Sequence, residues 1–382
     1  MRRIYSILAA FLLLLTLFGC KKQGDTGQSP TLPAVDNSSF PTADVQMQIQ
    51  QQPMIAASMP IVTQNYTDES GQIQLQHIYQ NLELIVPDQE IADAIIIDYL
   101  NRTDKFHTTA ESLFAEAVAA NKSEDTGDAF LFQTTYEPKR LDRGVLSLLG
   151  STIIHKGYSH PEVTAESVSY DLATGKALTI SDILRPDADL QTLSDHIRNA
   201  LQEQENTVTF YEGYDRTVQE LLENPTNWYF SPNGLVFYYS PYEIAPYSSG
   251  VITAQVDYEK LTNILSDAYF PAESDKLKGQ LFITPLDVDQ LDQFTQIAEV
   301  VCTQNEQQYM LYTDGLLEDI RIEQLKEHTA YTIFASPHIS PGDGIAIYVS
   351  PSDTYKIHYT TEGKRVAKTL AFTADGTPQL TD

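Results

Sequence analysis

The residue types that most often perform catalysis or bind metals are scattered along this chain. His155 and His160 are the closest pair among eight histidines, but they flank Gly157-Tyr158 in an expected loop. Zinc ligands usually lie on one helix face or in a tight knuckle, so this pair does not predict a metal site. Asp343, in Pro-Gly-Asp-Gly, is expected to be a turn residue, because the alternating oxygen ligands of a calcium loop are missing around it.

Motifs for nucleophilic or phosphate chemistry are also missing from the sequence. There is no Gly-x-Ser-x-Gly elbow, no P-loop and no His-Glu-x-x-His. Acidic residues are so numerous that spacing alone selects no catalytic pair. We therefore expect no enzyme, no catalytic residue, no metal and no cofactor, although the absence of a motif leaves an enzyme of unrecognised class open.

The chemistry that the sequence does suggest is binding by aromatic side chains between Trp228 and Tyr258. Residues 228–230 and 235–239 predict a β-hairpin around Pro232-Asn233-Gly234, where Asn-Gly would supply the positive φ angles of a tight turn. After Val251 the alternation of a strand returns, with one face formed by Ile252, Ala254, Val256 and Tyr258.

Between these strands, residues 241–250 predict a stiff loop. Pro241 and Pro246 remove two backbone donors and fix φ twice, so a regular central strand is excluded. Such a loop would present Tyr242 and Tyr247 to a ligand. We take Tyr242, Pro246, Tyr247 and Trp228 as candidate ligand-binding residues; the alternative is that most of these aromatic side chains form core.

The N-terminus predicts a bacterial lipoprotein. Residues 1–19 combine Arg2-Arg3 with an apolar run too short for a comfortable membrane span. The run ends in Leu-Phe-Gly-Cys, which resembles a lipobox with Phe18 in place of a smaller residue. We expect cleavage before Cys20, lipid attachment to its sulfur and a location on the outer face of the cytoplasmic membrane. An ordinary secretory signal or an uncleaved anchor is the alternative.

Residues 20–52 are rich in Gln, Ser, Thr, Pro and Gly without an apolar period, so we expect a flexible tether. If Cys20 carries lipid, Cys302 is the remaining cysteine of the mature chain, and we expect a buried, inert thiol in an apolar run.

The charge of the chain restricts its partners. It carries 52 acidic and 24 basic residues, for a formal net charge of −28. Such acidity argues against nucleic acid and against an anionic membrane surface. It favours a cationic partner through electrostatic steering, unless the charge serves solubility alone.

The remaining periodicities predict an α+β fold in two domains. Residues 53–270 predict a mixed sheet-and-helix domain, with one helix opening at Pro87-Asp88 and a second at about Thr108. Shorter helices are expected after an N-cap at Ser181, along a stripe of Leu190, Leu193, Ile197 and Leu201, and after a capping box at Thr217.

Residues 275–382 predict about eight short strands and a β-sandwich-like accessory domain. Within them, residues 309–320 predict a hairpin with a two-residue Asp314-Gly315 turn.

Two segments resemble a known family. Residues 170–184 (Tyr-Asp-Leu-x-Thr-Gly-Lys-x-Leu-Thr-Ile-Ser-Asp-Ile-Leu) and residues 227–250 (from Asn-Trp-Tyr-Phe-Ser-Pro-Asn-Gly to Ala-Pro-Tyr-Ser-Ser-Gly) are similar to the extracytoplasmic domain of the lysozyme-sensing anti-sigma factors of the RsiV type. The same domain accompanies some peptidoglycan deacetylases. The resemblance covers about residues 55–268 and implies an α+β receptor domain that binds lysozyme, with Tyr242, Pro246 and Tyr247 at its contact loop.

The chain also departs from that family. Three residues precede the apolar run, so we expect no cytoplasmic sigma-binding segment, and the Asp-Asp and His-x3-His pairs of a deacetylase are missing. The sequence thus predicts a non-catalytic surface lipoprotein that binds a cationic protein such as lysozyme. A peptidoglycan-binding module, with Trp228 and nearby tyrosines stacking on sugars, and an enzyme acting on the cell wall are the alternatives.

Overall fold

Four β-sheets and a few helices make up the part of the chain that the computed structural model describes. This part comprises residues 53–124, 129–157, 160–223, 226–271, 278–302, 307–326, 329–350, 352–373 and 377–382. It falls within one structural unit, Ser38–Asp382. The arrangement confirms the predicted α+β class. The signal segment, Cys20 and the tether lie outside the described residues.

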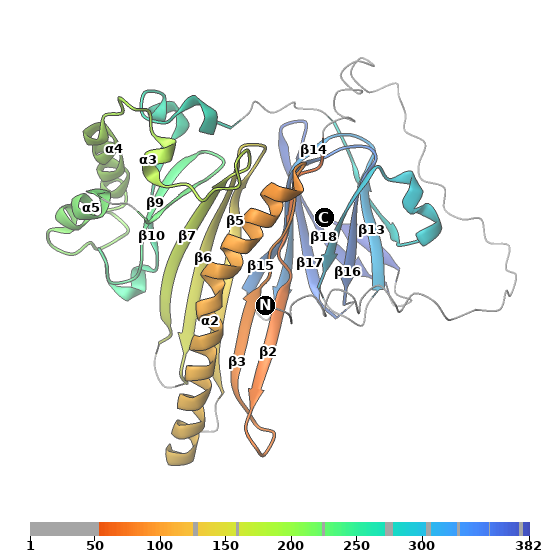
Figure 1. The fold of residues 1–382 in the computed structure, drawn as a ribbon, viewed down its shortest axis with the longest axis horizontal. Helices are drawn as coiled ribbons and strands as arrows, with labels where there is room; N and C mark the ends of the chain where they lie inside the picture. Colours follow the sequence, from red (N-terminus) through yellow and green to blue (C-terminus); the bar gives the residue numbers. More distant parts are fainter. Residues whose placement is uncertain are drawn as a thin grey trace, which may run out of the picture. The chain divides into compact units, whose positions relative to one another are not determined.

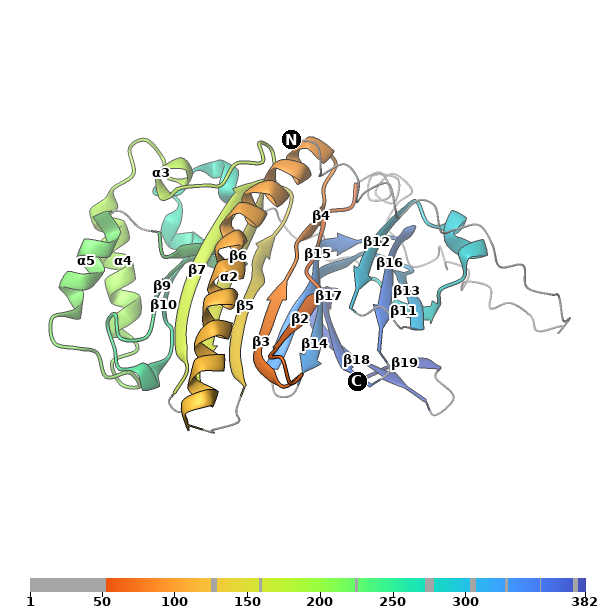
Figure 2. The same cartoon turned by 60° about the horizontal axis from the view of Figure 1, so that its bottom comes forward.

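A five-stranded sheet and one long helix form the first layer pair. The sheet has the order β2-β3-β5-β6-β7, in which only β3 and β5 run parallel. Figures 1 and 2 show helix α2 lying along one face of this sheet. The elements are β2 (Ile61–Thr67), β3 (Ile73–Gln80), α2 (Gln89–Glu124), β5 (Phe130–Leu141), β6 (Val145–His155) and β7 (Glu162–Asp171).

Helix α2 corrects the prediction of two helices. The polar segment at residues 101–105 contains no proline or glycine that would stop a helix. The buried stripe continues through it, because the side chains that face the sheet recur at helical spacing: Tyr99, Phe106, Ala110, Leu113 and Ala117. Within the described ranges, no helix is both long and apolar enough to cross a bilayer.

The aromatic hairpin belongs to a second layer pair. Strands β8 (Trp228–Phe230), β9 (Gly234–Tyr239) and β10 (Ile252–Asp257) form a three-stranded sheet in the order β10-β9-β8. It packs on helices α3 (Ile180–Ile183), α4 (Leu190–Gln202) and α5 (Tyr214–Glu223). The predicted pairing of β8 with β9 is confirmed, and so is the buried face of β10 at Ile252, Ala254 and Val256. Tyr258, predicted on the same face, instead begins the 3-10 helix Tyr258–Leu261.

The helix ends in this region differ from those predicted. Thr179, not Ser181, caps α3 through a capping box with Asp182. Helix α5 begins at Tyr214, so Thr217 lies inside it. In α4, Leu193, Ile197 and Leu201 are buried as predicted, whereas Leu190 in the first turn is exposed.

The turn between β8 and β9 also has a different cause from the one predicted. The backbone of Asn233 and Gly234 does not adopt positive φ. Instead, the Ser231 hydroxyl accepts from the Gly234 N–H at 3.1 Å and closes the turn. Glycine is required because a Cβ at position 234 would lie 2.2 Å from the Val256 carbonyl oxygen.

Two further sheets pack face to face and confirm the predicted β-rich region. A four-stranded sheet has the order β11-β13-β16-β12, and a seven-stranded sheet has the order β19-β18-β17-β14-β15-β1-β4. Their inner faces share one hydrophobic core. The first sheet comprises β11 (Leu281–Pro285), β12 (Gln296–Val301), β13 (Gln307–Thr313) and β16 (Asp343–Val349). The second comprises β1 (Ala56–Ser58), β4 (Glu83–Ile85), β14 (Leu317–Lys326), β15 (Thr329–Ile339), β17 (Thr354–Thr361), β18 (Lys364–Phe372) and β19 (Pro378–Thr381).

The predicted Asp314-Gly315 hairpin is wrong. Strand β13 pairs with β11 and β16, while β14 pairs with β15 and β17, so the chain crosses from one sheet to the other at this turn. A Cβ at Gly315 would lie 2.0 Å from the Lys278 carbonyl oxygen, and Asp314 Oδ1 accepts from the Gln280 N–H. The Asp-Gly pair therefore allows this turn to lie close to the segment that contains Lys278 and Gln280.

The N-terminal strands cross the expected boundary at residues 270–275. Strand β1 pairs with β15, and β4 with β1, so the seven-stranded sheet contains strands from both predicted domains. Arg321 donates to the Pro138 carbonyl at 2.7 Å, and Tyr331 donates to Gln133 at 3.0 Å. Cys302 is buried, as expected, and is not part of a disulfide.

Candidate functional site

The loop between β9 and β10 has an exposed tyrosine followed by two buried residues. Tyr242 is 56% exposed, while Ile244 and Ala245 are buried in the core of the three-stranded sheet. The Tyr242 N–H donates to the Ala245 carbonyl at 3.1 Å. Tyr242 has φ +73°, which a bulky side chain rarely adopts. Local strain of this kind clusters at ligand-contacting segments.

Tyr247 ties this loop to the turn between β6 and β7. Its hydroxyl donates to the Pro161 carbonyl at 2.7 Å, and its ring stacks on His160 with centroids 4.3 Å apart. The Tyr242 hydroxyl lies 3.4 Å from His160 Nε2, and the two tyrosine rings are 5.7 Å apart. Tyr242, Tyr247 and His160 therefore form one aromatic group, which we call the tyrosine loop cluster.

His160 is the member of this cluster that sequence reasoning missed. The sequence places it only near His155, and among the described residues no group of three or more His, Cys, Asp or Glu side chains could hold a metal ion. No signal in the local sequence links His160 to Tyr247, because the contact joins segments 87 residues apart.

Two of the four predicted ligand residues have other positions. Pro246 is half-buried and immediately precedes the short 3-10 helix Tyr247–Ser249, so it shapes the loop. Trp228 is only 5% exposed and lies edge-on to Phe230 in the core. Its ring faces cannot stack on a sugar in this conformation, so Trp228 leaves the candidate surface.

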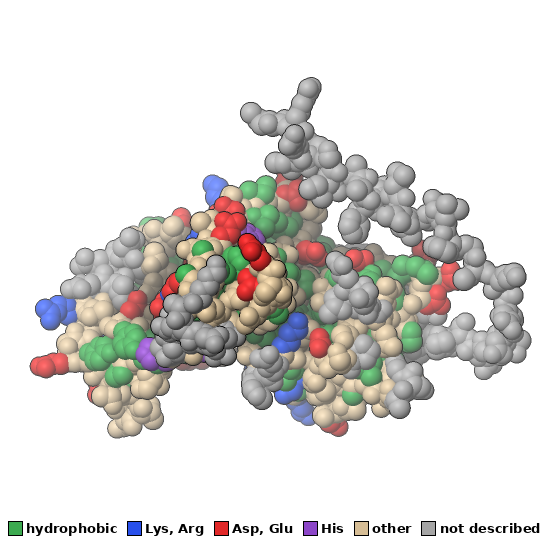
Figure 3. Space-filling view, turned by 90° about the horizontal axis from the view of Figure 1, so that it is seen from below, with side chains coloured by type: hydrophobic (Ala, Val, Ile, Leu, Met, Phe, Trp, Pro, Cys, Tyr) green, Lys and Arg blue, Asp and Glu red, His purple; other side chains and the backbone are tan. Residues whose placement is uncertain are grey.

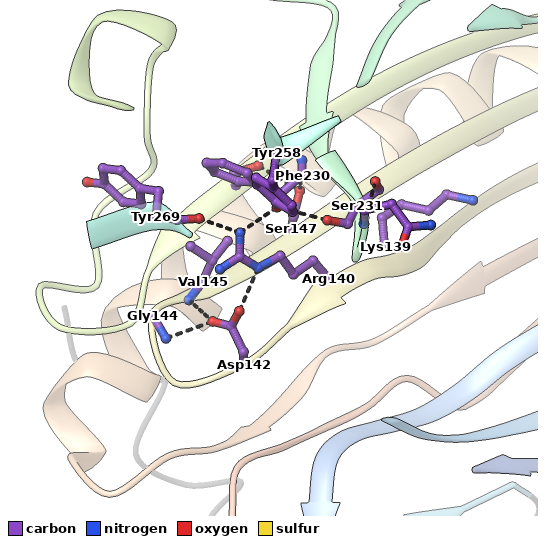
Figure 4. A network of polar contacts seen from close by, with 12 residues as sticks. Lys139, Arg140, Asp142, Gly144, Val145, Ser147, Phe230, Ser231, Tyr258 and Tyr269 are labelled. Atoms are coloured by element: carbon purple, nitrogen blue, oxygen red, sulfur yellow. Dashed lines mark hydrogen bonds and ion pairs between the residues drawn. The ribbon is translucent and has the colours of Figure 1, made fainter. Parts of the chain in front are cut away.

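A buried arginine fastens the aromatic hairpin to the five-stranded sheet (Figure 4). Arg140 donates to Asp142 at 2.5 Å, to the Tyr258 hydroxyl at 2.7 Å and to the Tyr269 carbonyl at 2.6 Å. Its guanidinium also lies 5.2 Å from the Phe230 ring centroid. A buried cation with this many partners is structural, because each partner removes part of its desolvation cost.

A cleft of about 240 Å³ forms a second place of interest, between α2 and strands β5 and β7. Lys105 lies 2.7 Å from Glu166, and the Tyr136 hydroxyl also donates to Glu166. Burial and the Glu166 charge raise the pKa of Tyr136 far above its usual value. Glu166 is thus already bound by two donors of the protein itself. We therefore regard the cleft as a weaker candidate for a ligand site than the tyrosine loop cluster. Its walls are lined by Asn101, Arg102, Lys105, Tyr136, Glu166, Ser167 and Val168.

The fold defines an α+β protein in which the loop between β9 and β10 carries the exposed Tyr242. Residues 181–259, which contain that loop, match the family described as "Protein of unknown function (DUF3298)". The match includes Trp228, Tyr242, Pro246 and Tyr247 and ends before the sandwich.

Two solved structures are similar to part of this chain. A DUF3298 family member from Bacteroides fragilis is 15% identical, with 56% of this chain and 95% of that chain covered and a TM-score of 0.41. A DUF3298 family protein from Pseudomonas aeruginosa is 16% identical, with 59% and 100% covered and a TM-score of 0.40. No curated protein matches this chain.

Proposed function

We propose that this chain is a lipid-anchored, extracytoplasmic binding protein whose tyrosine loop cluster contacts a cationic protein such as lysozyme. The observation that carries the proposal is the exposed Tyr242, whose backbone has positive φ and whose ring lies 5.7 Å from that of Tyr247. A tyrosine that is already ordered loses little conformational entropy on binding, which favours affinity.

The charge of the chain supports a cationic partner over a neutral one. The net charge of −28 attracts basic proteins over a Debye length of roughly 8–10 Å at moderate salt. In Figure 3 acidic side chains occupy several separate places on the face shown, and basic ones are fewer. The resemblance to RsiV-type receptor domains is compatible with the DUF3298 match and points to the same partner.

The anchor completes the proposal. Lipid on Cys20 and the tether of residues 20–52 would hold residues 53–382 at the outer face of the membrane. A binding role without catalysis agrees with a sequence that has no recognised catalytic motif. The proposed protein therefore presents its cluster to partners that reach the cell envelope.

Calorimetric titration of the full chain, kept in a neutral detergent, with a C-type lysozyme tests the proposal. We expect binding at low salt that weakens steeply as salt is raised, because charge drives the encounter. Tyr242→Ala should weaken binding about tenfold or more, as expected for an aromatic contact residue. Leu190→Ala, an exposed apolar residue on α4, is the matched control and should leave affinity unchanged.

Peptidoglycan binding is the second candidate, and the structure gives it less support than the sequence did. The buried Trp228 removes the best sugar-stacking ring, although the exposed ring of Tyr242 can still stack. Titration with soluble peptidoglycan fragments separates the two functions. Salt-insensitive binding of fragments, without lysozyme binding at low salt, would replace our proposal with the glycan-binding one.

A further inference from the structure

A second loop beside the tyrosine loop cluster carries the same dipeptide. Residues 203–213 connect α4 to α5 and contain Tyr211-Glu212, while the β9–β10 loop contains Tyr242-Glu243. Tyr211 is 40% exposed and Tyr242 is 56% exposed. Both glutamates are exposed as well. Two loops thus present an aromatic ring followed directly by a carboxylate.

The backbone joins these two loops. The Tyr211 N–H donates to the Ile244 carbonyl at 2.9 Å. Each loop also packs on the same core. Ile244 of one loop is buried in it, and Phe210 of the other is partly buried against it and stacks on Tyr214 with ring centroids 4.5 Å apart. The two exposed tyrosines are therefore carried by neighbouring, anchored segments.

The stretch of sequence that contains both loops is mostly acidic, and Lys260 follows it directly. Residues 199–259 contain one basic residue, Arg216, which lies beside Gly213. The Arg198 guanidinium, at the preceding helix, is already paired with Asp195 and Asp215. The acidic residues of the same stretch are Glu203, Glu205, Glu212, Asp215, Glu220, Glu223, Glu243, Asp257 and Glu259. A basic side chain that approaches these loops thus meets mostly negative charge.

We propose that Tyr211-Glu212 and Tyr242-Glu243 form one surface, the double Tyr-Glu surface, which binds arginine or lysine side chains of a folded cationic protein. A tyrosine face attracts a cation, and a neighbouring carboxylate accepts its N–H groups. The inference rests on the proposed function for the class of partner. It adds a second loop to the contact and assigns the chemistry by which the partner is recognised.

The chain offers a matched control for charge. Tyr258-Glu259 is another Tyr-Glu pair, but it lies outside both loops, and the Tyr258 hydroxyl is engaged with Arg140 and the Ser231 carbonyl. Glu259 is exposed. Glu212→Gln and Glu259→Gln therefore each remove one negative charge, so both should weaken the long-range attraction to a cationic partner by a similar amount. Only Glu212→Gln should also remove a direct contact.

The test is titration of full-length variants in neutral detergent with a C-type lysozyme at low salt. We expect Tyr211→Ala and Glu212→Gln each to raise Kd about fivefold or more, as for contact residues at an interface. Glu259→Gln should raise it less than about twofold. Tyr211→Phe keeps the ring face and should bind like the wild type, which separates ring chemistry from loss of the loop structure.

The outcomes distinguish this inference from the proposed function. In one outcome the wild type binds and Tyr242→Ala weakens binding, but Tyr211→Ala and Glu212→Gln bind like Glu259→Gln. The second loop then makes no contact with the partner, so this inference is wrong while the proposed function stands. If Tyr211→Phe binds as poorly as Tyr211→Ala, recognition by the ring face is wrong. If the wild type does not bind lysozyme at low salt, the proposed function itself fails.

Discussion

Tyr136 and Glu166 meet across an intervening strand of the five-stranded sheet. Tyr136 lies on β5 and Glu166 on β7, and both are in register with Gly150 on β6. The tyrosine ring lies over Gly150, where a Cβ would come within 2.6 Å of its Cε1 atom. The hydroxyl then reaches Glu166. The glycine thus makes room for a contact that forms one wall of the cleft beside α2.

Gly150→Ala should therefore destabilise the protein. The added methyl group must displace the buried Tyr136 ring, and overpacking of this kind costs about 1–3 kcal/mol. Urea unfolding followed by circular dichroism measures the loss. Gly144→Ala, where a Cβ meets its nearest neighbour at 3.5 Å, is the matched control and should be close to neutral. Equal stability of the two variants would contradict the prediction, because it would show that the Tyr136 ring can move away from the added methyl group without a loss of folding free energy.

Arg140→Lys should loosen the aromatic hairpin. Lysine cannot reproduce donation from separate nitrogens to Asp142, Tyr258 and the Tyr269 carbonyl. We expect a loss of about 2–4 kcal/mol in the free energy of unfolding, since breaking buried ionic contacts leaves partners without compensation. Trp228, the single tryptophan, is buried next to Phe230, so its fluorescence during urea unfolding reports on this region.

The control for Arg140→Lys is Arg185→Lys. Arg185 pairs with Asp267 at 3.1 Å, but its side chain is 38% exposed and Asp267 is 87% exposed. Surface pairs contribute little, so we expect a change below about 1 kcal/mol. A loss as small for Arg140→Lys would contradict the structural role assigned to the buried network.

Asp343 should make the protein less stable as pH rises from about 4 to 6. Burial raises the pKa of its carboxyl to about 6, from 3.8 in an exposed chain. Across this range the folded protein keeps a proton that the unfolded chain has released, so raising pH favours unfolding. Asp343→Asn should remove this slope and gain about 1–3 kcal/mol relative to wild type above pH 6. Thermal unfolding at several pH values measures it.

Two outcomes decide this prediction. The Asp343 carboxylate accepts from the Ser340 N–H at 2.8 Å, and asparagine can keep this bond through its carbonyl oxygen. If the difference in stability between Asp343→Asn and wild type stays constant from pH 4 to 6, Asp343 does not titrate in this range and the prediction is wrong. If the variant is instead less stable at every pH, the carboxylate stabilises the turn more than burial penalises it.

His77 should have the opposite pH dependence. Burial, and to a smaller extent His107, lowers the pKa of His77 to about 4 from 6.5. The ring is 1% exposed and stacks on Phe132 at 4.6 Å, so the charged form is disfavoured in the fold. As pH falls from about 6.5 to 4, the unfolded chain binds a proton that the fold does not, and stability declines.

His77→Phe should flatten that decline, because phenylalanine keeps the stacked ring and cannot be protonated. Its loss of the Thr134 contact shifts stability by a constant that does not depend on pH. Because the slopes of His77 and Asp343 oppose each other, the His77→Phe comparison is best made in the Asp343→Asn background. An unchanged decline between pH 6.5 and 4 in that background would exclude His77 as its source.

Predictions from the sequence are confirmed where the residues that contact one another lie close together in the chain. The β8–β9 hairpin and the buried faces of α4 and β10 follow from periodicity within about thirty residues. The prediction of two helices is wrong, because the polar residues 101–105 do not end α2. The surface of a long helix can be polar for a turn while its buried face continues.

The sequence by itself determined the α+β class, the acidic surface and the stiff loop that bears Tyr242, because composition, alternation and prolines act on neighbouring residues. Only the tertiary structure decided which side chains the loop exposes. Packing placed Trp228 in the core, put His160 under Tyr247 and brought Tyr211 beside Ile244. It also sent β13 and β14 to different sheets, although an Asp-Gly turn joins them. These outcomes depend on contacts between distant segments, which no local pattern encodes.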